Sequence, residues 1–256
     1  MNKIEKQREH FDGIADRYYK ARQGKNHLHF KHLLWKYFFR GIDWKKKRTL
    51  VLEPMCGYSE GLKILRKNLN TEIIYEGFDY SQPLIDEVKK NNPKIKIYKQ
   101  DVTKFKTNNK YDIIIIIGGL HHVYSHTNII LNNLRNCLSK EGYMIIFEPT
   151  QNNFLLRFIR DKIYRKNEIF DSDTEKAFDL CALNESFRKN KLKIEKQIYP
   201  GLLGYILYYN PDAFPLLNIG GRLFVEIIFN VDKYFYRNFI GKCWSFATMT
   251  LLKREE

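Results

Sequence analysis

The feature that most constrains the fold of this 256-residue sequence is a regular alternation of short β-rich runs with helix-length segments, which begins at Leu50. The run "DIIIII" at 112–117 is apolar after its first residue, as is typical of a strand buried on both faces of a parallel sheet. The order predicts a parallel sheet with helices on both faces. The expected strands are Leu50–Glu53, Glu72–Asp79, Ile95–Tyr98, Asp112–Ile117 and Tyr143–Glu148, and the expected helices are Ser59–Asn68, Gln82–Asn91 and Asn128–Ser139.

The segments on either side of this alternation have a different character. Residues 1–40 carry apolar residues at helical spacing. After Pro149 we expect a helix at Thr174–Asn190, a strand at Lys193–Tyr199 and a final strand at Ser245–Lys253. We interpret the chain as one domain, residues 1–256, in three parts: an N-terminal helical cap (1–48), a core (49–149), and a substrate-binding part (150–256) whose insertion 201–243 forms a lid.

Composition limits the compartment and the partners. The net charge is +15, and residues 1–50 carry 14 Lys/Arg against 5 Asp/Glu. Such a charge attracts phosphate, nucleic acid or an anionic membrane, although an A+T-rich genome would also enrich lysine. The four cysteines have no paired spacing, which argues against a metal site and favours a reducing compartment. The polar N-terminus indicates no signal peptide, so we expect a cytoplasmic protein.

The residues that follow the predicted strands suggest a ligand site, because ligands of open α/β sheets bind beyond the carboxyl ends of the strands. The first strand ends at Glu53 and leads into the turn of "VLEPMCGYSEG", where Gly57 lets the backbone approach a ligand. Asp79 ends the second strand and can accept hydrogen bonds from both hydroxyls of a ribose. Asp101 follows the third strand and can accept from an exocyclic amine. Alternatively, Asp79 caps the helix after Ser81 and Asp101 caps a turn. In combination, these residues predict a bound nucleoside.

A nicotinamide dinucleotide is the competing ligand for a glycine turn followed by a ribose-binding acid. Its usual motif is G-x-G-x-x-G, and "CGYSEG" does not supply it. Acidic residues after both the second and the third strand also favour a single nucleoside over a dinucleotide.

At these positions the chain resembles the class I S-adenosylmethionine-dependent methyltransferases, in particular the small-molecule branch that includes quinone and phosphobase enzymes. The resemblance rests on "VLEPMCGYSEG", "GFDYS", "QDVTKF" and "YDIIIIIGGLHHV", and "FDGIADRYYKAR" resembles the N-terminal helix that closes over the cofactor. It covers residues 11–150 well and 174–200 loosely. Met55 and Ser59 stand where the family usually has glycines, and Glu53 replaces the commoner Asp. The resemblance implies a Rossmann-like, seven-stranded, mostly parallel sheet with helices on both faces, an N-terminal helical cap and a lid insertion before the last strand.

The resemblance also implies S-adenosyl-L-methionine as cofactor and assigns residues to its adenosine half. Asp79 would bind the ribose, and Tyr80 would pack on the adenine. Asp101 would accept from the adenine amine, with the amide of Val102 nearby.

Further residues are expected at the methionine half of the cofactor. Glu53 belongs to the same motif as Gly57, and the backbones of Gly57 and Gly118 would hold the methionine moiety. Tyr18 or Arg22, on the N-terminal helix, would reach its carboxylate.

Two adjacent histidines follow the fourth strand, beside the expected methyl group. If the acceptor is a hydroxyl, a general base speeds transfer by roughly 10²–10⁴-fold, and histidine titrates in a suitable range. By resemblance to the phosphobase enzymes we prefer His122 to His121 as this base, with Tyr18 or Tyr19 as its partner. The alternative is that one histidine caps the next helix or packs under the loop.

The acceptor is expected to contact the part of the chain after the fifth strand. Five basic residues follow "EPT" and form either a phosphate clamp or a solvated helix face: Arg157, Arg160, Lys162, Arg165 and Lys166. Residues 222–239 are apolar enough for a lid helix, a dimer contact or a peripheral membrane contact.

The leading functional hypothesis is O-methylation of an anionic small molecule or surface-polysaccharide precursor, such as a phosphate or phosphoramidate group in capsule polysaccharide biosynthesis. A quinone or lipid methyltransferase at the membrane surface is one alternative. An RNA-binding methyltransferase or a non-catalytic RNA-binding protein is another, and the lack of an aromatic-basic RNA module argues against nucleic acid as a partner.

Overall fold

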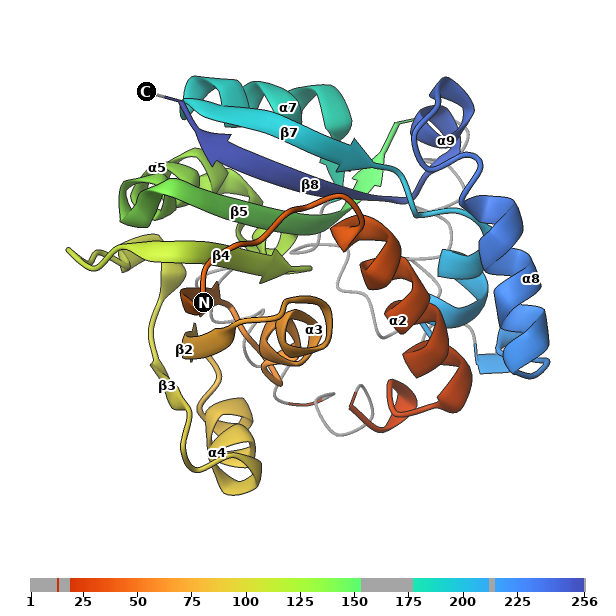
Figure 1. The fold of residues 1–256 in the computed structure, drawn as a ribbon, viewed down its shortest axis with the longest axis horizontal. Coiled ribbons are helices and arrows are strands. Elements are labelled where there is room, and N and C mark those ends of the chain that lie inside the picture. Colours follow the sequence, from red (N-terminus) through yellow and green to blue (C-terminus); the bar gives the residue numbers. More distant parts are fainter. Residues whose placement is uncertain (1–12, 14–18, 153–176, 212–214, 256) are drawn as a thin grey trace.

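The computed structural model describes residues 13, 19–152, 177–211 and 215–255. Its sheet has the order β3-β2-β1-β4-β5-β8-β7, and β6 pairs with the end of β5. β1 to β5 are parallel, and β8 runs antiparallel to both of its neighbours (Figure 1). The strands are β1 (Arg48–Pro54), β2 (Glu72–Asp79), β3 (Lys96–Lys99), β4 (Tyr111–Ile117), β5 (Leu138–Gln151), β6 (Phe178–Asp179), β7 (Leu192–Ile198) and β8 (Ala247–Arg254).

The helices form two layers, one on each face of this sheet. The helices are α2 (Lys25–Phe39), α3 (Glu60–Asn68), α4 (Gln82–Asn91), α5 (Thr127–Cys137), α7 (Leu180–Lys189), α8 (Arg222–Asp232) and α9 (Phe239–Trp244). α2, α3 and α8 share one apolar core with the sheet, and α5 and α7 share another. β4 contributes to both, because Ile113 and Ile115 face the first core and Ile114 and Ile116 face the second. The predicted double burial of "DIIIII" and the predicted Rossmann-like sheet are therefore confirmed.

Most predicted elements agree with the structure to within a few residues, and one differs in kind. The helix expected from Thr174 begins at Leu180, and Phe178–Asp179 instead form β6 beside β5. The Asp179 side chain accepts a hydrogen bond from Ala182 N at 2.9 Å, so Asp179 is the N-cap that sets the start of α7. Residues 174–176 lie outside the described part of the chain.

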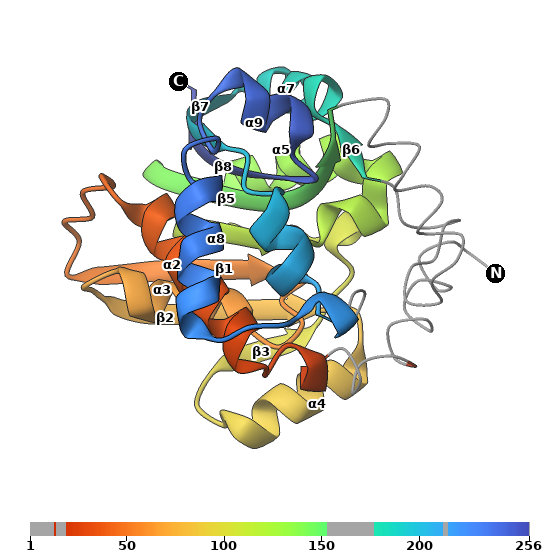
Figure 2. The same cartoon turned by 90° about the vertical axis from the view of Figure 1, so that its right-hand side faces the viewer.

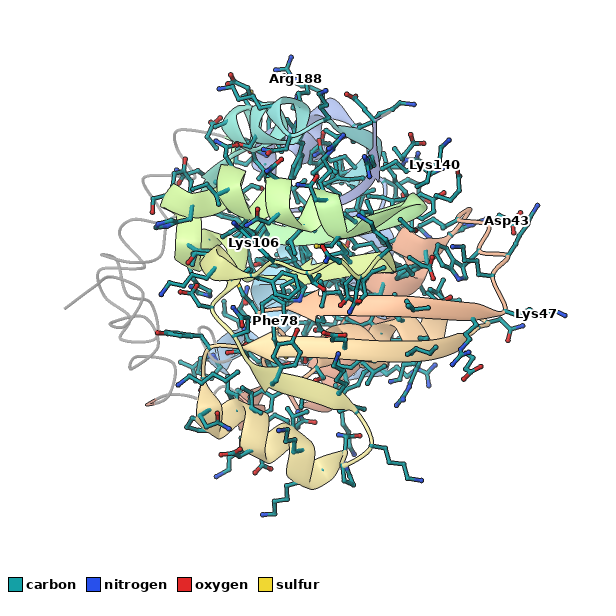
Figure 3. All side chains as sticks on the ribbon, turned by 90° about the vertical axis from the view of Figure 1, so that its left-hand side faces the viewer. Asp43, Lys47, Phe78, Lys106, Lys140 and Arg188 are labelled. Carbon is teal, nitrogen blue, oxygen red and sulfur yellow. The ribbon has the colours of Figure 1, made fainter. Side chains whose placement is uncertain are left out.

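The segment between β7 and β8 contains more than one helix. The Tyr205–Tyr209 turn packs on α2, α8 follows it, and α9 begins at Phe239, where the Asn238 side chain accepts from Gly241 N. α8 lies outside α2 and at the edge of the molecule (Figures 1 and 2). Figure 3 shows the side opposite α8, where Lys106 lies on the face toward the viewer and Lys47 and Arg188 extend from the margin of the molecule.

Candidate cofactor site

The turn after β1 combines three residues with positive φ. Met55, Gly57 and Ser59 have φ of 52°, 47° and 55°. A non-glycine residue in this region costs about 1–2 kcal/mol, and such strain tends to persist at functional sites. The chain therefore keeps a left-handed turn although Met and Ser occupy two of its positions.

The two glycines of this turn have different physical roles. A Cβ added at Gly57 would meet nothing within 4 Å, so this residue leaves open space in front of the turn. A Cβ added at Gly61 would lie 2.8 Å from both Glu53 Cδ and Ile115 Cγ2. Gly61 is therefore required for the close packing of α3 against β1 and β4.

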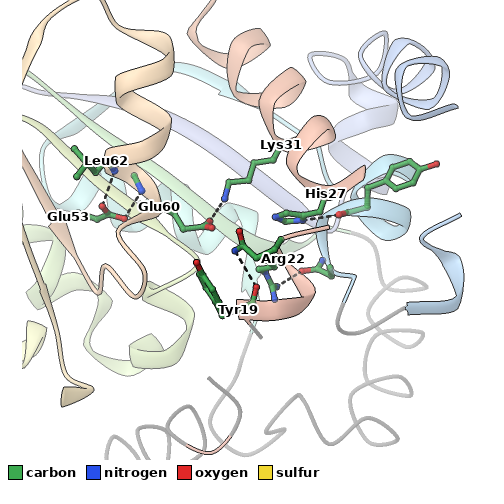
Figure 4. A network of polar contacts seen from close by, with 11 residues as sticks. Tyr19, Arg22, His27, Lys31, Glu53, Glu60 and Leu62 are labelled. Carbon is green, nitrogen blue, oxygen red and sulfur yellow. Dashed lines mark hydrogen bonds and ion pairs between the residues drawn. The ribbon is translucent and has the colours of Figure 1, made fainter. Parts of the chain in front are cut away.

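Glu53 supports the turn from beneath. Its carboxylate accepts hydrogen bonds from Gly61 N at 2.8 Å, Leu62 N at 3.2 Å and the Tyr75 hydroxyl at 2.8 Å (Figure 4). Burial raises the pKa of Glu53 to about 7, although these hydrogen bonds favour the charged form. The side chain is 2% exposed, so its observed contacts are with the chain itself and it shapes the turn. Tyr75 was not identified from the sequence.

Asp79 joins the end of β2 to the same turn. Its Oδ2 accepts from Gly57 N at 2.8 Å, and its Oδ1 accepts from Ser81 N at 3.0 Å. The two residues expected to bind opposite halves of the cofactor are thus in direct contact. The bond to Ser81 N also agrees with the alternative that Asp79 organises the start of α4, and the two roles are compatible.

Asp101 caps a short 3-10 turn, Val102–Lys104, as its alternative interpretation predicts. Its Oδ1 accepts from Thr103 N at 2.8 Å and from Thr103 Oγ1 at 2.7 Å. Val102 is buried. Next to this turn, the Lys99 ammonium lies 5.5 Å from the centroid of the Tyr80 ring. The contact with adenine stays a prediction for Asp101, Val102 and Tyr80.

Residues 19–31 pack against the turn and α3 from the other side. The Tyr19 ring lies 4.5 Å from the Tyr58 ring, and Arg22 Nη2 donates to Asn210 Oδ1 at 3.3 Å (Figure 4). The Lys31 ammonium lies 2.5 Å from the Glu60 carboxylate at the start of α3.

The Lys31–Glu60 ion pair is strong enough to keep Glu60 charged in a half-buried position. Burial opposes ionisation of Glu60, but Lys31 outweighs this effect and lowers the pKa of Glu60 to about 2. Tyr18 and the five basic residues between 157 and 166 lie outside the described residues.

A buried carboxylate at the end of β5 holds the histidine loop after β4. Glu148 Oε1 accepts from Gly119 N at 2.9 Å and from Leu120 N at 2.8 Å, and Glu148 Oε2 lies 2.8 Å from His121 Nδ1. Glu148 is 1% exposed, and this burial raises its pKa to about 7 against the opposing effect of the N–H donors. The carboxylate therefore fixes both the loop and the orientation of the His121 ring.

The sequence favours His122 as the base, and this stays a prediction; in the structure Glu148 contacts His121 Nδ1, and His122 lies close enough to lower the pKa of the same carboxyl. The His122 ring lies beside that of His121 at an interplanar angle of 43°, with ring centroids 3.8 Å apart. Glu148 was not among the predicted site residues, although "EPT" follows the fifth predicted strand. β4 and β5 pair in parallel with Ile117 opposite Phe147. The residues that follow this pair, Gly118 on one strand and Glu148 on the other, therefore lie close together at the carboxyl ends of the strands.

The histidine loop and the turn after β1 form one continuous site. A Cβ on Gly119 would lie 2.9 Å from Met55 Cε, so the Met55 side chain packs directly on the loop. Gly118 has φ 61°, and a Cβ there would lie 3.8 Å from His121 Cε1. The open space at Gly57, the adjoining Asp79 carboxylate and the glycine backbone before His121 fit an adenosyl group with an amino-acid tail.

Comparison with solved structures shows the same fold in proteins of low sequence identity. A chain of the complex between the Haloferax volcanii Trm112 methyltransferase activator and a methyltransferase matches with TM-score 0.65 and 14% identity, over 97% of both chains. The cyclopropane synthase MmaA2 from Mycobacterium tuberculosis matches with TM-score 0.58 and 14% identity, over 87% of this chain and 82% of that one. An O-methyltransferase from a Brevibacillus brevis trans-AT PKS multienzyme, in complex with S-adenosyl-L-homocysteine, matches with TM-score 0.55 and 16% identity. The match covers 89% of this chain and 72% of that one.

Comparison at the level of sequence identifies the core. No curated protein matches the chain. Residues 51–142, which run from β1 through the histidine loop into β5, match the family described as "Methyltransferase domain". Residues 51–142 therefore carry a methyltransferase domain, and the chain has the fold of S-adenosylmethionine-dependent methyltransferases, which supports S-adenosyl-L-methionine as its cofactor.

Proposed function

We propose that the chain belongs to the small-molecule branch of these enzymes and methylates an oxygen atom of an anionic acceptor. The observation that supports O-methylation is the His121–Glu148 pair beside the turn after β1. A hydroxyl is a poor nucleophile until it loses its proton, so its methylation benefits from a positioned base. A buried carboxylate that orients an imidazole is a common way to build such a base.

The proposed roles follow from the contacts of each side chain. When bound, S-adenosylmethionine supplies an activated methyl group. Asp79 binds its ribose, and Asp101 binds its adenine amine. With Nδ1 directed at Glu148, His121 uses Nε2 to accept the proton of the acceptor, and Glu148 stabilises the resulting imidazolium.

Aromatic side chains of the 201–243 insertion pack near the carboxyl end of β5. The rings of Tyr205 and Tyr209 are stacked at 5.1 Å, and Tyr209 lies 5.1 Å from Phe147, the residue before Glu148. We propose that this turn of the 201–243 insertion positions the acceptor, and that the insertion acts as its lid. The anionic character of the acceptor rests on the net charge of +15, and a polysaccharide precursor with a phosphate or phosphoramidate group has the required chemistry.

An acceptor panel with methyl-labelled cofactor tests this proposal. The panel contains sugar phosphates, phosphoramidates, quinols and RNA, and mass spectrometry identifies the methylated atom. We expect O-methylation of an anionic acceptor, and we expect His121→Asn to lower kcat by roughly 10²–10⁴-fold with little change in cofactor affinity. His126→Asn is the matched control, because His126 lies in the same turn but its ring contacts Ser125. Methylation of carbon or nitrogen, or an unchanged rate in His121→Asn, would refute the proposal.

A further inference from the structure

α8 is apolar on two opposite faces, and within the described part of the chain only one of them is covered. Val225 and Phe229 are buried in the core that α8 shares with α2. Leu223, Ile227 and Val231 are 72%, 49% and 50% exposed. Residues four apart lie on the same side of a helix, so these three side chains form a single outward stripe.

Exposed apolar side chains continue from this stripe into the flanking segments. Tyr234, just after α8, is 75% exposed. α9 and the residues before α8 also lie at this side of the molecule (Figures 1 and 2). We call the following set the outer apolar surface: Leu216, Ile219, Leu223, Ile227, Val231, Tyr234, Phe239, Ile240 and Trp244. Clustered exposure of large apolar side chains is unusual and marks an interaction surface.

The charges around the outer apolar surface are mainly basic. Its segment, residues 215–244, contains four basic residues: Arg222, Lys233, Arg237 and Lys242. Its two acidic residues are a buried aspartate and a glutamate that pairs with Arg222 of the same segment, so Lys233, Arg237 and Lys242 give the surface its net positive charge. Asp232 is 3% exposed and accepts from Gly204 N, and Glu226 is held by Arg222 and His29. The surface therefore presents apolar side chains within a positive field.

We propose that the outer apolar surface docks on an anionic lipid bilayer. Exposed Leu, Ile and Phe side chains can enter the acyl boundary, Trp244 and Tyr234 are suited to the headgroup level, and the basic residues complement anionic lipids. A second copy of the chain is the weaker match, because a two-fold contact would bring the same basic side chains together. Within the described part of the chain, no helix is long and apolar enough to cross a membrane, so the contact is interfacial.

Vesicle co-sedimentation of the full chain tests this inference without any acceptor or turnover, so its outcome is independent of the proposed function. We expect the protein to bind vesicles that contain phosphatidylglycerol at least about tenfold more tightly than pure phosphatidylcholine vesicles, with a strong salt dependence. Emission from Trp244 should shift to shorter wavelength on binding, and Trp244→Phe should abolish that shift.

Two matched pairs of variants locate the contact. Ile227→Ser should weaken binding several-fold, and Leu223→Ser/Ile227→Ser/Phe239→Ser should weaken it by roughly 100-fold or more. Ile129→Ser is the apolar control, because Ile129 is 55% exposed on α5, on the other face of the sheet. Arg237→Glu/Lys242→Glu should weaken binding by roughly tenfold or more. Lys47→Glu/Lys106→Glu changes the net charge equally on the side shown in Figure 3 and should have a much smaller effect.

Three outcomes would overturn the inference. The first is a wild-type protein that binds neither vesicle. The second is an equal loss of binding in the variants and in their controls, because binding would then reflect net charge alone. The third is a concentration-dependent dimer in sedimentation velocity that the triple variant abolishes, because the surface would then join two copies of the chain. Unchanged circular dichroism and cofactor affinity show that each variant is folded.

Discussion

The carboxylate of Asp79 accepts a hydrogen bond from the amide of Gly57 at 2.8 Å, which ties the end of β2 to the turn after β1. Asp79→Ala should therefore lower cofactor affinity by roughly 100-fold or more, because it removes a charged acceptor from the ribose and loosens the turn. Isothermal titration calorimetry with S-adenosylhomocysteine measures this change. Asp86→Ala on the exposed face of α4 is the control, and wild-type affinity in Asp79→Ala would refute the ribose assignment.

The left-handed conformation of Ser59 makes an unusual prediction about stability. At φ 55° alanine is strained and glycine is not, so Ser59→Gly should be more stable than Ser59→Ala by about 1 kcal/mol. The matched position is Ser186 in the regular helix α7, where alanine should be the more stable by about 1 kcal/mol. Urea denaturation measures all four variants, and the same order at both positions would contradict the assigned strain.

The buried Glu53 and the half-buried Glu60 should change the free energy of unfolding in different pH ranges. The folded-state pKa of Glu53 is about 7, above its ordinary value of 4.5, so the folded protein binds more protons than the unfolded chain between these pH values. Its contribution to the free energy of unfolding should fall as pH rises from 4.5 to 7, by up to about 1.4 kcal/mol per pH unit. Glu53→Gln should remove this slope.

Glu60 should behave in the opposite sense. Its folded-state pKa is about 2, below the ordinary 4.5, so its stabilisation is complete above pH 4.5 and is lost as pH falls to 2. Glu60→Gln should flatten the acid limb of the stability profile and leave the range from 4.5 to 7 unchanged. An identical profile for Glu53→Gln and Glu60→Gln, measured by chemical denaturation at each pH, would refute both assignments.

The pair of Glu148 and His121 should appear in the pH dependence of turnover. Only the ionised carboxylate accepts all of its N–H donors, so kcat/KM should rise as pH increases through the pKa of Glu148, which burial raises to about 7. Glu148→Gln should lower kcat and flatten this limb while cofactor affinity stays close to wild type. Glu141→Gln, on the same strand but exposed, should keep the wild-type profile. A wild-type profile in Glu148→Gln would show that Glu148 is only structural.

The sequence predicted features that depend on local pattern. The buried run of β4 has a strong local signal, and the acidic residues at the ends of β2 and β3 and the small-residue turn become informative in combination. The sequence could not predict contacts that depend on which strands are neighbours in the sheet. Glu148 meets the histidine loop only because β4 and β5 pair in register, and the contact between Glu148 and His121 Nδ1 follows from that pairing. The positive φ of Met55 could not be predicted from the sequence either, because non-glycine residues seldom adopt it.

The central claim is that the cofactor lies on the turn between Met55 and Gly61, in contact with Asp79 and the loop before His121. A crystal structure of the protein soaked with S-adenosylhomocysteine tests it most directly. We predict density for the ribose at the Asp79 carboxylate and for the amino-acid tail at the backbones of Gly57 and Gly118. Well-defined density at any other part of the chain would contradict the account.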